Sequence, residues 1–131
     1  MTAPSASNRF VVDSTGWVEY LGDGPKADAF ARYLLDSERV FLPTIVVYEV
    51  YKKILRELGR ALAEEFLSQA YSFHDREVVL DTALAALAAR TSLEANLPMA
   101  DAIIYASAQI SRAELITSDA HFTGLPGVTI L

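Results

Sequence analysis

The chain has 131 residues, of which 52% are hydrophobic and 21% are charged, and it contains no cysteine. These values are typical of one folded globular domain, and they exclude a disordered or fibrous protein, disulfide cross-links and thiolate metal sites. The formal net charge of −6 argues against a protein that binds nucleic acid along a uniformly basic surface.

Residues 1–8 are mostly small and polar, and we interpret them as a flexible lead before a single domain over residues 9–131. No segment is apolar over a length that would cross a bilayer, and the first residues lack the apolar stretch of an export signal. We therefore expect no membrane partner and a cytoplasmic location, which the lack of cysteine also favours.

The first half of the chain alternates short apolar runs with helix-forming segments. In chain order, the predicted elements are a strand over 10–12, helices over 17–21 and 26–35, a strand over 40–42, and helices over 44–58 and 60–71. Asp13 follows the first strand, and aspartate is a residue type that commonly caps the free N–H groups at the start of a helix. Gly59 separates the two long helices.

The second half repeats this alternation. The predicted elements are a strand over 77–80, helices over 82–95 and 99–111, a strand over 115–117, a turn over 118–122 and a final strand over 128–131. Strands that alternate with helices favour an α/β fold, in which a mostly parallel sheet is covered by helices on both faces.

Four acidic residues stand out at the ends of these elements. Asp13 and Asp119 follow apolar strands, and ligands of parallel sheets gather beyond the carboxyl ends of the strands. Glu49 and Asp101 interrupt apolar runs close to the beginnings of two helices. A partly buried carboxylate without a partner is costly, so a bound cation is a reasonable explanation for both.

Each acid also has a purely structural explanation. Asp13 and Asp119 can cap the elements that follow them, and Asp101 can interact favourably with the positive end of its helix dipole. Glu49 can face solvent or pair with a lysine one turn later. Individually these alternatives stay open, but the joint pattern of four acids favours a shared site.

The composition of the proposed site favours a hard, oxygen-seeking ion. With four acids and only two histidines in the chain, Mg²⁺ or Mn²⁺ is a better match than zinc. We interpret His74 as a surface loop residue. His121 is expected to be a local hydrogen-bonding group, with contact to a substrate phosphate as the alternative.

Small hydroxyl and basic side chains surround the acids. Ser14, Thr117 and Ser118 adjoin the outer two acids and can orient carboxylates or contact phosphate, although all three can also act as ordinary caps. Basic residues recur along the helix that carries Glu49, where they can guide a phosphate backbone or form a solvated face. They are Lys52, Lys53, Arg56 and Arg60.

Four blocks of sequence resemble the PIN-domain family and, within it, the VapC-type toxins of toxin–antitoxin modules. The blocks are VVDSTGWVEYL, LPTIVVYEVYK, LPMADAIIYASA and LITSDAHFTGLPGVTIL. Their order and spacing extend over nearly the whole chain. Position by position, the acidic site of the family falls on Asp13, Glu49, Asp101 and Asp119, with Thr117 and Ser118 in the supporting motif.

The resemblance implies a three-layer α/β/α fold and Mg²⁺- or Mn²⁺-dependent cleavage of RNA. It also implies a homodimer and an antitoxin protein whose C-terminal segment covers a groove at the site. Aromatic residues at helical spacing are candidates for that groove, or for the core. They are Trp17, Tyr20, Tyr51 and Tyr105.

Three other readings compete with a toxin ribonuclease. A phosphoacceptor receiver domain has a similar length and acids at strand ends, but it needs a late lysine, and no lysine follows Lys53. A PIN-domain nuclease that processes RNA without an antitoxin fits the sequence as well as a toxin does. A non-catalytic PIN scaffold that binds protein or RNA is the third alternative.

Overall fold

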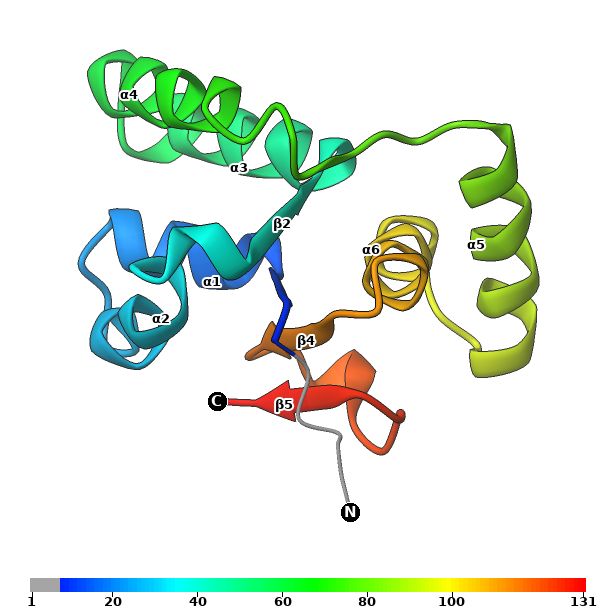
Figure 1. Cartoon of the computed structure of the whole chain (residues 1–131). Helices are drawn as coiled ribbons and strands as arrows, with labels where there is room; N and C mark the ends of the chain where they lie inside the picture. Colours follow the sequence, from blue (N-terminus) through cyan, green and yellow to red (C-terminus); the bar gives the residue numbers. More distant parts are fainter. Residues whose placement is uncertain (1–7) are drawn as a thin grey trace.

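The computed structural model describes residues 8–131 (Figure 1). Except for Asn8, the lead predicted over residues 1–8 lies outside the described residues. The strands are β1 (Phe10–Val12), β2 (Val40–Pro43), β3 (Glu77–Val78), β4 (Glu114–Thr117) and β5 (Val128–Ile130). The helices are α1 (Ser14–Leu21), α2 (Ala27–Leu34), α3 (Thr44–Glu57), α4 (Arg60–Tyr71), α5 (Thr82–Ala95) and α6 (Met99–Ile110), with the short 3-10 helices η2 (Ser37–Arg39) and η3 (Ala120–Phe122).

The five strands form one sheet in the order β3-β2-β1-β4-β5, and every neighbouring pair is parallel. β1 lies in the centre, where Phe10 is paired with Val40 of β2 and with Glu114 of β4. The chain moves outward from β1 through β2 to β3 and then crosses back to β4 on the other side. The strand order therefore reverses between β1 and β4, and sheets of this kind bind ligands at such a point.

Helices cover both faces of the sheet, so the predicted three-layer α/β/α architecture is confirmed (Figure 1). The pair α1 and α2 lies on one side, and the pair α5 and α6 lies on the other. α3 packs against both α1 and α6, and α4 folds back along α3. Among residues 8–131, no helix combines the length and the apolar character that crossing a bilayer requires.

The core is built from the apolar faces that the sequence pattern predicts. Val11 and Val12 of β1 are fully buried, as are Phe30 of α2 and Phe66 of α4. On α3 the buried residues recur every four positions, at Val46, Val50 and Ile54, as expected for one face of a helix.

Three local features differ from the prediction, and the simplest is that β3 ends at Val78 rather than at residue 80. α1 begins at Ser14 rather than at residue 17, because the Asp13 carboxylate accepts a hydrogen bond from the Ser14 N–H and caps the helix there. The short η2 helix was not predicted from the sequence. It is a single 3-10 turn without buried residues, so no apolar periodicity marks it.

Candidate metal centre

The centre begins where β1 ends, with Asp13. This carboxylate is 2% exposed and accepts hydrogen bonds from the Ser14 N–H at 2.7 Å, the Thr15 hydroxyl at 3.0 Å and the Thr117 hydroxyl at 2.8 Å. Burial raises the pKa of Asp13, and these three hydrogen bonds oppose that effect. Asp13 is therefore both the cap of α1 and a buried, oriented carboxylate.

Thr117, the last residue of β4, connects two of the acids. Its hydroxyl donates to Asp13 and accepts a hydrogen bond from the Asp119 N–H at 2.9 Å. The side chain is fully buried, so these two bonds fix its rotamer. One hydroxyl group thus holds the loop after β4 against the end of β1.

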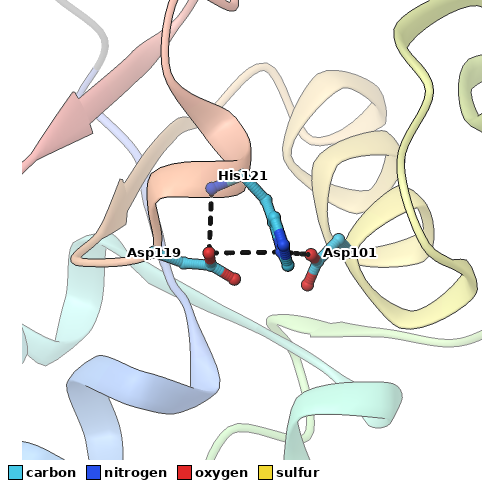
Figure 2. A group of neighbouring side chains, drawn as sticks. All are labelled: Asp101, Asp119 and His121. Carbon is cyan, nitrogen blue, oxygen red and sulfur yellow. Dashed lines mark hydrogen bonds and ion pairs between the residues drawn. The ribbon is translucent and has the colours of Figure 1, made fainter.

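Asp119 and Asp101 meet at the ring of His121, as Figure 2 shows. His121 Nδ1 lies 2.8 Å from Asp101 Oδ2 and 3.3 Å from Asp119 Oδ1. The Asp119 carboxylate also accepts a hydrogen bond from the His121 N–H at 2.9 Å. Burial raises the pKa of Asp101, and the hydrogen bond with Asp101 raises the pKa of His121. One donor atom from each of the three residues lies within 4.8 Å of the other two.

Glu49 joins the same cluster from α3. Burial raises the pKa of its carboxyl group, a hydrogen bond with the Ser14 side chain opposes this, and repulsion from the other three acids adds to it. Those three acids are Asp13, Asp101 and Asp119. Within the described residues its partner is thus Ser14 and not a lysine of the next turn. Because α3 packs between α1 and α6, the helix carries Glu49 to the carboxyl end of the sheet.

The donor set of this cluster fits a divalent ion. Four carboxylates that repel one another are destabilising unless a cation neutralises them. Carboxylate oxygens are the ligands that Mg²⁺ and Mn²⁺ prefer. The described cluster therefore has the chemistry of a hard-metal centre, with the His121 ring at its edge.

A cavity of about 300 Å³ adjoins Glu49 and has basic walls. Lys52, Lys53 and Arg56 of α3 line it, together with Ser14 and Thr15. The prediction that Arg60 continues this basic row on the same helix is wrong. α3 ends at Glu57, and Gly59 adopts a φ of +103°, which redirects the chain so that Arg60 begins α4.

The hydroxyl groups differ in what they contact. Ser14 lies 3.4 Å from Asp13 and also bonds Glu49, whereas Ser118 lies 3.4 Å from the Thr15 hydroxyl and is bonded to no acid in the described part of the chain. Sequence reasoning missed Thr15 as a partner of Asp13.

The two histidines have different surroundings. His74 lies in an exposed turn, as predicted. The local part of the His121 prediction is confirmed by its bond to Asp119, but its contact with Asp101 was not foreseen. No sequence pattern signals that contact, because the two residues are brought together by the packing of α6 beside β4.

The aromatic residues proposed for a groove are divided between core and surface. Tyr105 is 5% exposed and donates its hydroxyl hydrogen to the Pro126 carbonyl, so its assignment to a groove is wrong. Trp17 is 3% exposed, packs edge-on against Phe66, and lines a pocket together with Tyr20. Tyr51 does line an open groove between α3 and α4.

The chain was compared with known families and structures. The family model of the PIN domain matches residues 10–127. A comparison with curated proteins gave no match.

Solved structures show the same fold at low sequence identity. A toxin–antitoxin complex from Klebsiella pneumoniae is 21% identical with a TM-score of 0.70, covering 91% of this chain and 94% of that one. FitAB bound to the IR36 DNA fragment is 23% identical with a TM-score of 0.72 (92% and 94% covered). DNA-bound VapBC from Salmonella typhimurium is 21% identical with a TM-score of 0.66 (94% and 96% covered). The family match extends over most of the chain, and this protein belongs to the PIN domain family.

Proposed function

We propose that this protein is a metal-dependent endoribonuclease and the toxin of a toxin–antitoxin module, acting in the cytoplasm as a single domain over residues 9–131. One observation carries the proposal: Thr117 links Asp13 to Asp119 by hydrogen bonds, and the His121 ring lies between Asp119 and Asp101. Glu49 lies close enough to these three acids for their charges to raise its pKa, so four acids from separate elements share one site. PIN domains are typically nucleases that use divalent metal ions, and this arrangement supplies the acids that such chemistry needs.

The proposed roles follow from what each side chain contacts. Asp13, Glu49, Asp101 and Asp119 would hold Mg²⁺ or Mn²⁺, which when bound activates a water and stabilises charge at the phosphate. Thr117 and Ser14 would orient Asp13 and Glu49, and Ser118, whose hydroxyl lies 3.4 Å from that of Thr15, would contact a phosphate oxygen. Hydrolysis of the phosphodiester would then leave two RNA fragments.

Substrate binding is assigned to the basic cavity. Lys52, Lys53 and Arg56 lie one to two turns after Glu49 and share a cavity with it. Their positive charge would attract the RNA backbone to a protein whose net charge is −6. This local arrangement would allow a protein with an overall negative charge to bind RNA.

The first test is cleavage of a mixed cellular RNA pool by purified wild type and Asp13→Asn, with Mn²⁺, with Mg²⁺ and with EDTA. We expect cleavage only with metal, and its loss in Asp13→Asn. Asparagine has nearly the same shape as aspartate, so circular dichroism should show an unchanged fold. A folded wild type that binds metal but cuts no RNA would favour the non-catalytic scaffold instead.

The antitoxin partner is proposed from two observations. Structures with this fold include toxin–antitoxin complexes. In addition, an apolar groove of about 470 Å³ between α3 and α4 continues from the basic cavity, with which it shares Tyr48, Lys52 and Arg56. An antitoxin segment with apolar side chains, ending in acidic ones, would cover both.

This partner is tested by growth of cells that express the protein. We expect growth arrest, and we expect that the gene beside this one encodes a small protein whose co-expression restores growth. Leu55→Glu, which places a charge in the groove, should prevent rescue while the arrest persists. An active ribonuclease without such a neighbour would favour the RNA-processing alternative.

A homodimer is proposed through the exposed face of α5 and α6. Leu93 and Met99 are 88% and 74% exposed, and they line a groove together with the buried Ala88, Ala102 and Ile103. The same face thus carries protruding side chains and a groove to receive them, which a two-fold symmetric contact requires. Light scattering should give twice the chain mass for wild type and the single mass for Leu93→Lys.

A further inference from the structure

The position of His121 goes beyond the four acids of the proposed site. Its Nδ1 atom points at Asp101 Oδ2, and the same atom is within 3.3 Å of Asp119 Oδ1 (Figure 2). The nitrogen therefore faces the two oxygens that would hold an ion, while the rest of the His121 side chain is largely exposed.

We propose that His121 Nδ1 is a metal ligand together with Asp101 and Asp119, and that this nitrogen makes the centre prefer Mn²⁺ over Mg²⁺. The inference rests on the divalent metal of the proposed function, but not on RNA as the substrate. It assigns the preference for Mn²⁺ over Mg²⁺ to His121, because the four acids alone do not produce this preference.

The spacing of the donor atoms fits a shared ion. Ligands of an octahedral Mg²⁺ lie about 2.0–2.1 Å from the metal, so neighbouring ligand atoms are about 3 Å apart. The distances of 2.8 and 3.3 Å from Nδ1 to the two carboxylate oxygens match neighbouring positions of that kind. An ion can replace the present hydrogen bonds with little movement of the three side chains.

The residues before and after His121 fix its backbone position. Asp119 caps the η3 turn by accepting the His121 N–H, and the next residue, Phe122, is fully buried. The turn is thus anchored in the core, while the His121 side chain is 62% exposed. A hydrated ion can reach the ring without any opening of the fold.

The preference follows from the chemistry of the donors. Mg²⁺ takes oxygen ligands and keeps several of its waters. Mn²⁺ also binds carboxylates well, but it belongs to the first-row transition series, whose affinity order for nitrogen and oxygen sites begins with Mn²⁺ and rises towards Cu²⁺. A set of two carboxylates and one imidazole therefore adds affinity for Mn²⁺ and little for Mg²⁺.

The direct test is pulsed electron paramagnetic resonance of bound Mn²⁺, which detects a coordinated nitrogen. The full chain is labelled with ¹⁵N in its histidines only, and it contains only two, His74 and His121. We expect a histidine nitrogen coupling in wild type and in the control His74→Asn, and its loss in His121→Asn. His74 is the matched control because it lies in an exposed turn.

Binding constants for the two ions provide the second readout. In His121→Asn we expect the Kd for Mn²⁺ to rise about tenfold, while the Kd for Mg²⁺ changes less than twofold. Equal weakening of both ions, or a wild-type spectrum without histidine coupling, would overturn the inference and leave His121 as a group that orients Asp101.

These experiments test the metal ligand separately from the ribonuclease activity. A Mn²⁺ centre with histidine coupling in a protein that cuts no RNA would refute the ribonuclease and retain the ligand. Ordinary cleavage with no change of metal preference in His121→Asn would refute the ligand and retain the ribonuclease.

Discussion

The two walls of the candidate centre differ in how firmly they are held. The acidic wall, which consists of Asp13, Asp101 and Asp119, is fixed by hydrogen bonds at the ends of buried elements. The basic wall consists of Lys52, Lys53 and Arg56, which are exposed on one helix face. Arg56 forms only a surface pair with Glu57, and Lys52 contacts the ring of Tyr48.

This difference suggests separate tasks for the two walls, with cleavage assigned to the acidic wall and RNA binding to the basic wall. A buried, oriented carboxylate has already been desolvated during folding, so it can act at short range on a metal or water. Exposed lysine and arginine side chains are mobile and screened by salt, and each contributes modestly to binding a polyanion. We therefore expect substitutions in the acidic wall to lower the rate of cleavage, and substitutions in the basic wall to weaken binding.

The largest effect is expected for Asp119→Asn. Loss of one charged ligand should cost about 3 kcal/mol of transition-state stabilisation or more, which lowers kcat by at least about 100-fold. Single-turnover cleavage with saturating enzyme measures the rate. Asp23→Asn is the control, since this exposed turn residue has a φ of +52°, which asparagine tolerates. Similar cleavage rates for both variants would show that Asp119 is not needed for catalysis.

A smaller loss is expected for Thr117→Val. The valine has the same shape but cannot donate to Asp13 or accept from Asp119, so we expect cleavage to fall by about 10- to 100-fold. The unpaired buried groups should also lower the free energy of unfolding by about 1–3 kcal/mol. Thr117→Ser keeps the hydroxyl and should retain most of the activity. If the serine variant were as impaired as valine, packing rather than hydrogen bonding would be responsible.

The acidic wall and Glu49 should also make the metal-free protein less stable as the pH rises. The pKa values of Asp13 and Glu49 are raised, so between their ordinary and native values the folded state binds more protons than the unfolded state. Stability is then lost as the pH rises from about 4 upward through the native values. The raised pKa of His121 also stabilises the folded state at low pH. This stabilisation is fully present below pH 6.5 and is lost as the pH rises through the native pKa.

Urea denaturation in EDTA between pH 5 and pH 8 measures this effect. Relative to wild type, Asp13→Asn should gain stability as the pH rises, because the amide cannot ionise. Adding Mn²⁺ should abolish the loss in wild type at pH 8. A difference between the two proteins that does not depend on pH would show that Asp13 is not destabilised by ionisation.

The smallest effect is expected in the basic wall. Lys52→Ala and Lys53→Ala should each raise KM a few-fold, leave kcat nearly unchanged and reduce the salt dependence of RNA binding by about one charge. Titrations at several salt concentrations test this. Arg32→Ala, an exposed position on α2, should change neither quantity. A fall in kcat without a change in KM would mean that these cations act on the reacting phosphate.

Much of the fold could be predicted from local patterns. Within residues 8–131, apolar runs and helical spacing located every strand and all six α-helices, because burial periodicity and caps act over a few residues. The run Val11–Val12 followed by Asp13 also indicated a carboxylate at the exit of a buried strand. That inference needs only the direction of the strand and the costs of burial.

Tertiary structure alone decided which side chains meet. The contact of His121 with Asp101 depends on the position of α6 beside β4, and the approach of Glu49 to Asp13 depends on α3 lying between α1 and α6. It also decided that Tyr105 is buried and that Arg60 lies on a new helix. The sequence by itself determined the elements and the acids at their ends, because propensity and capping are local. Strand order and helix packing join residues far apart in the chain, so only the folded structure could bring the acids and the histidine into one centre.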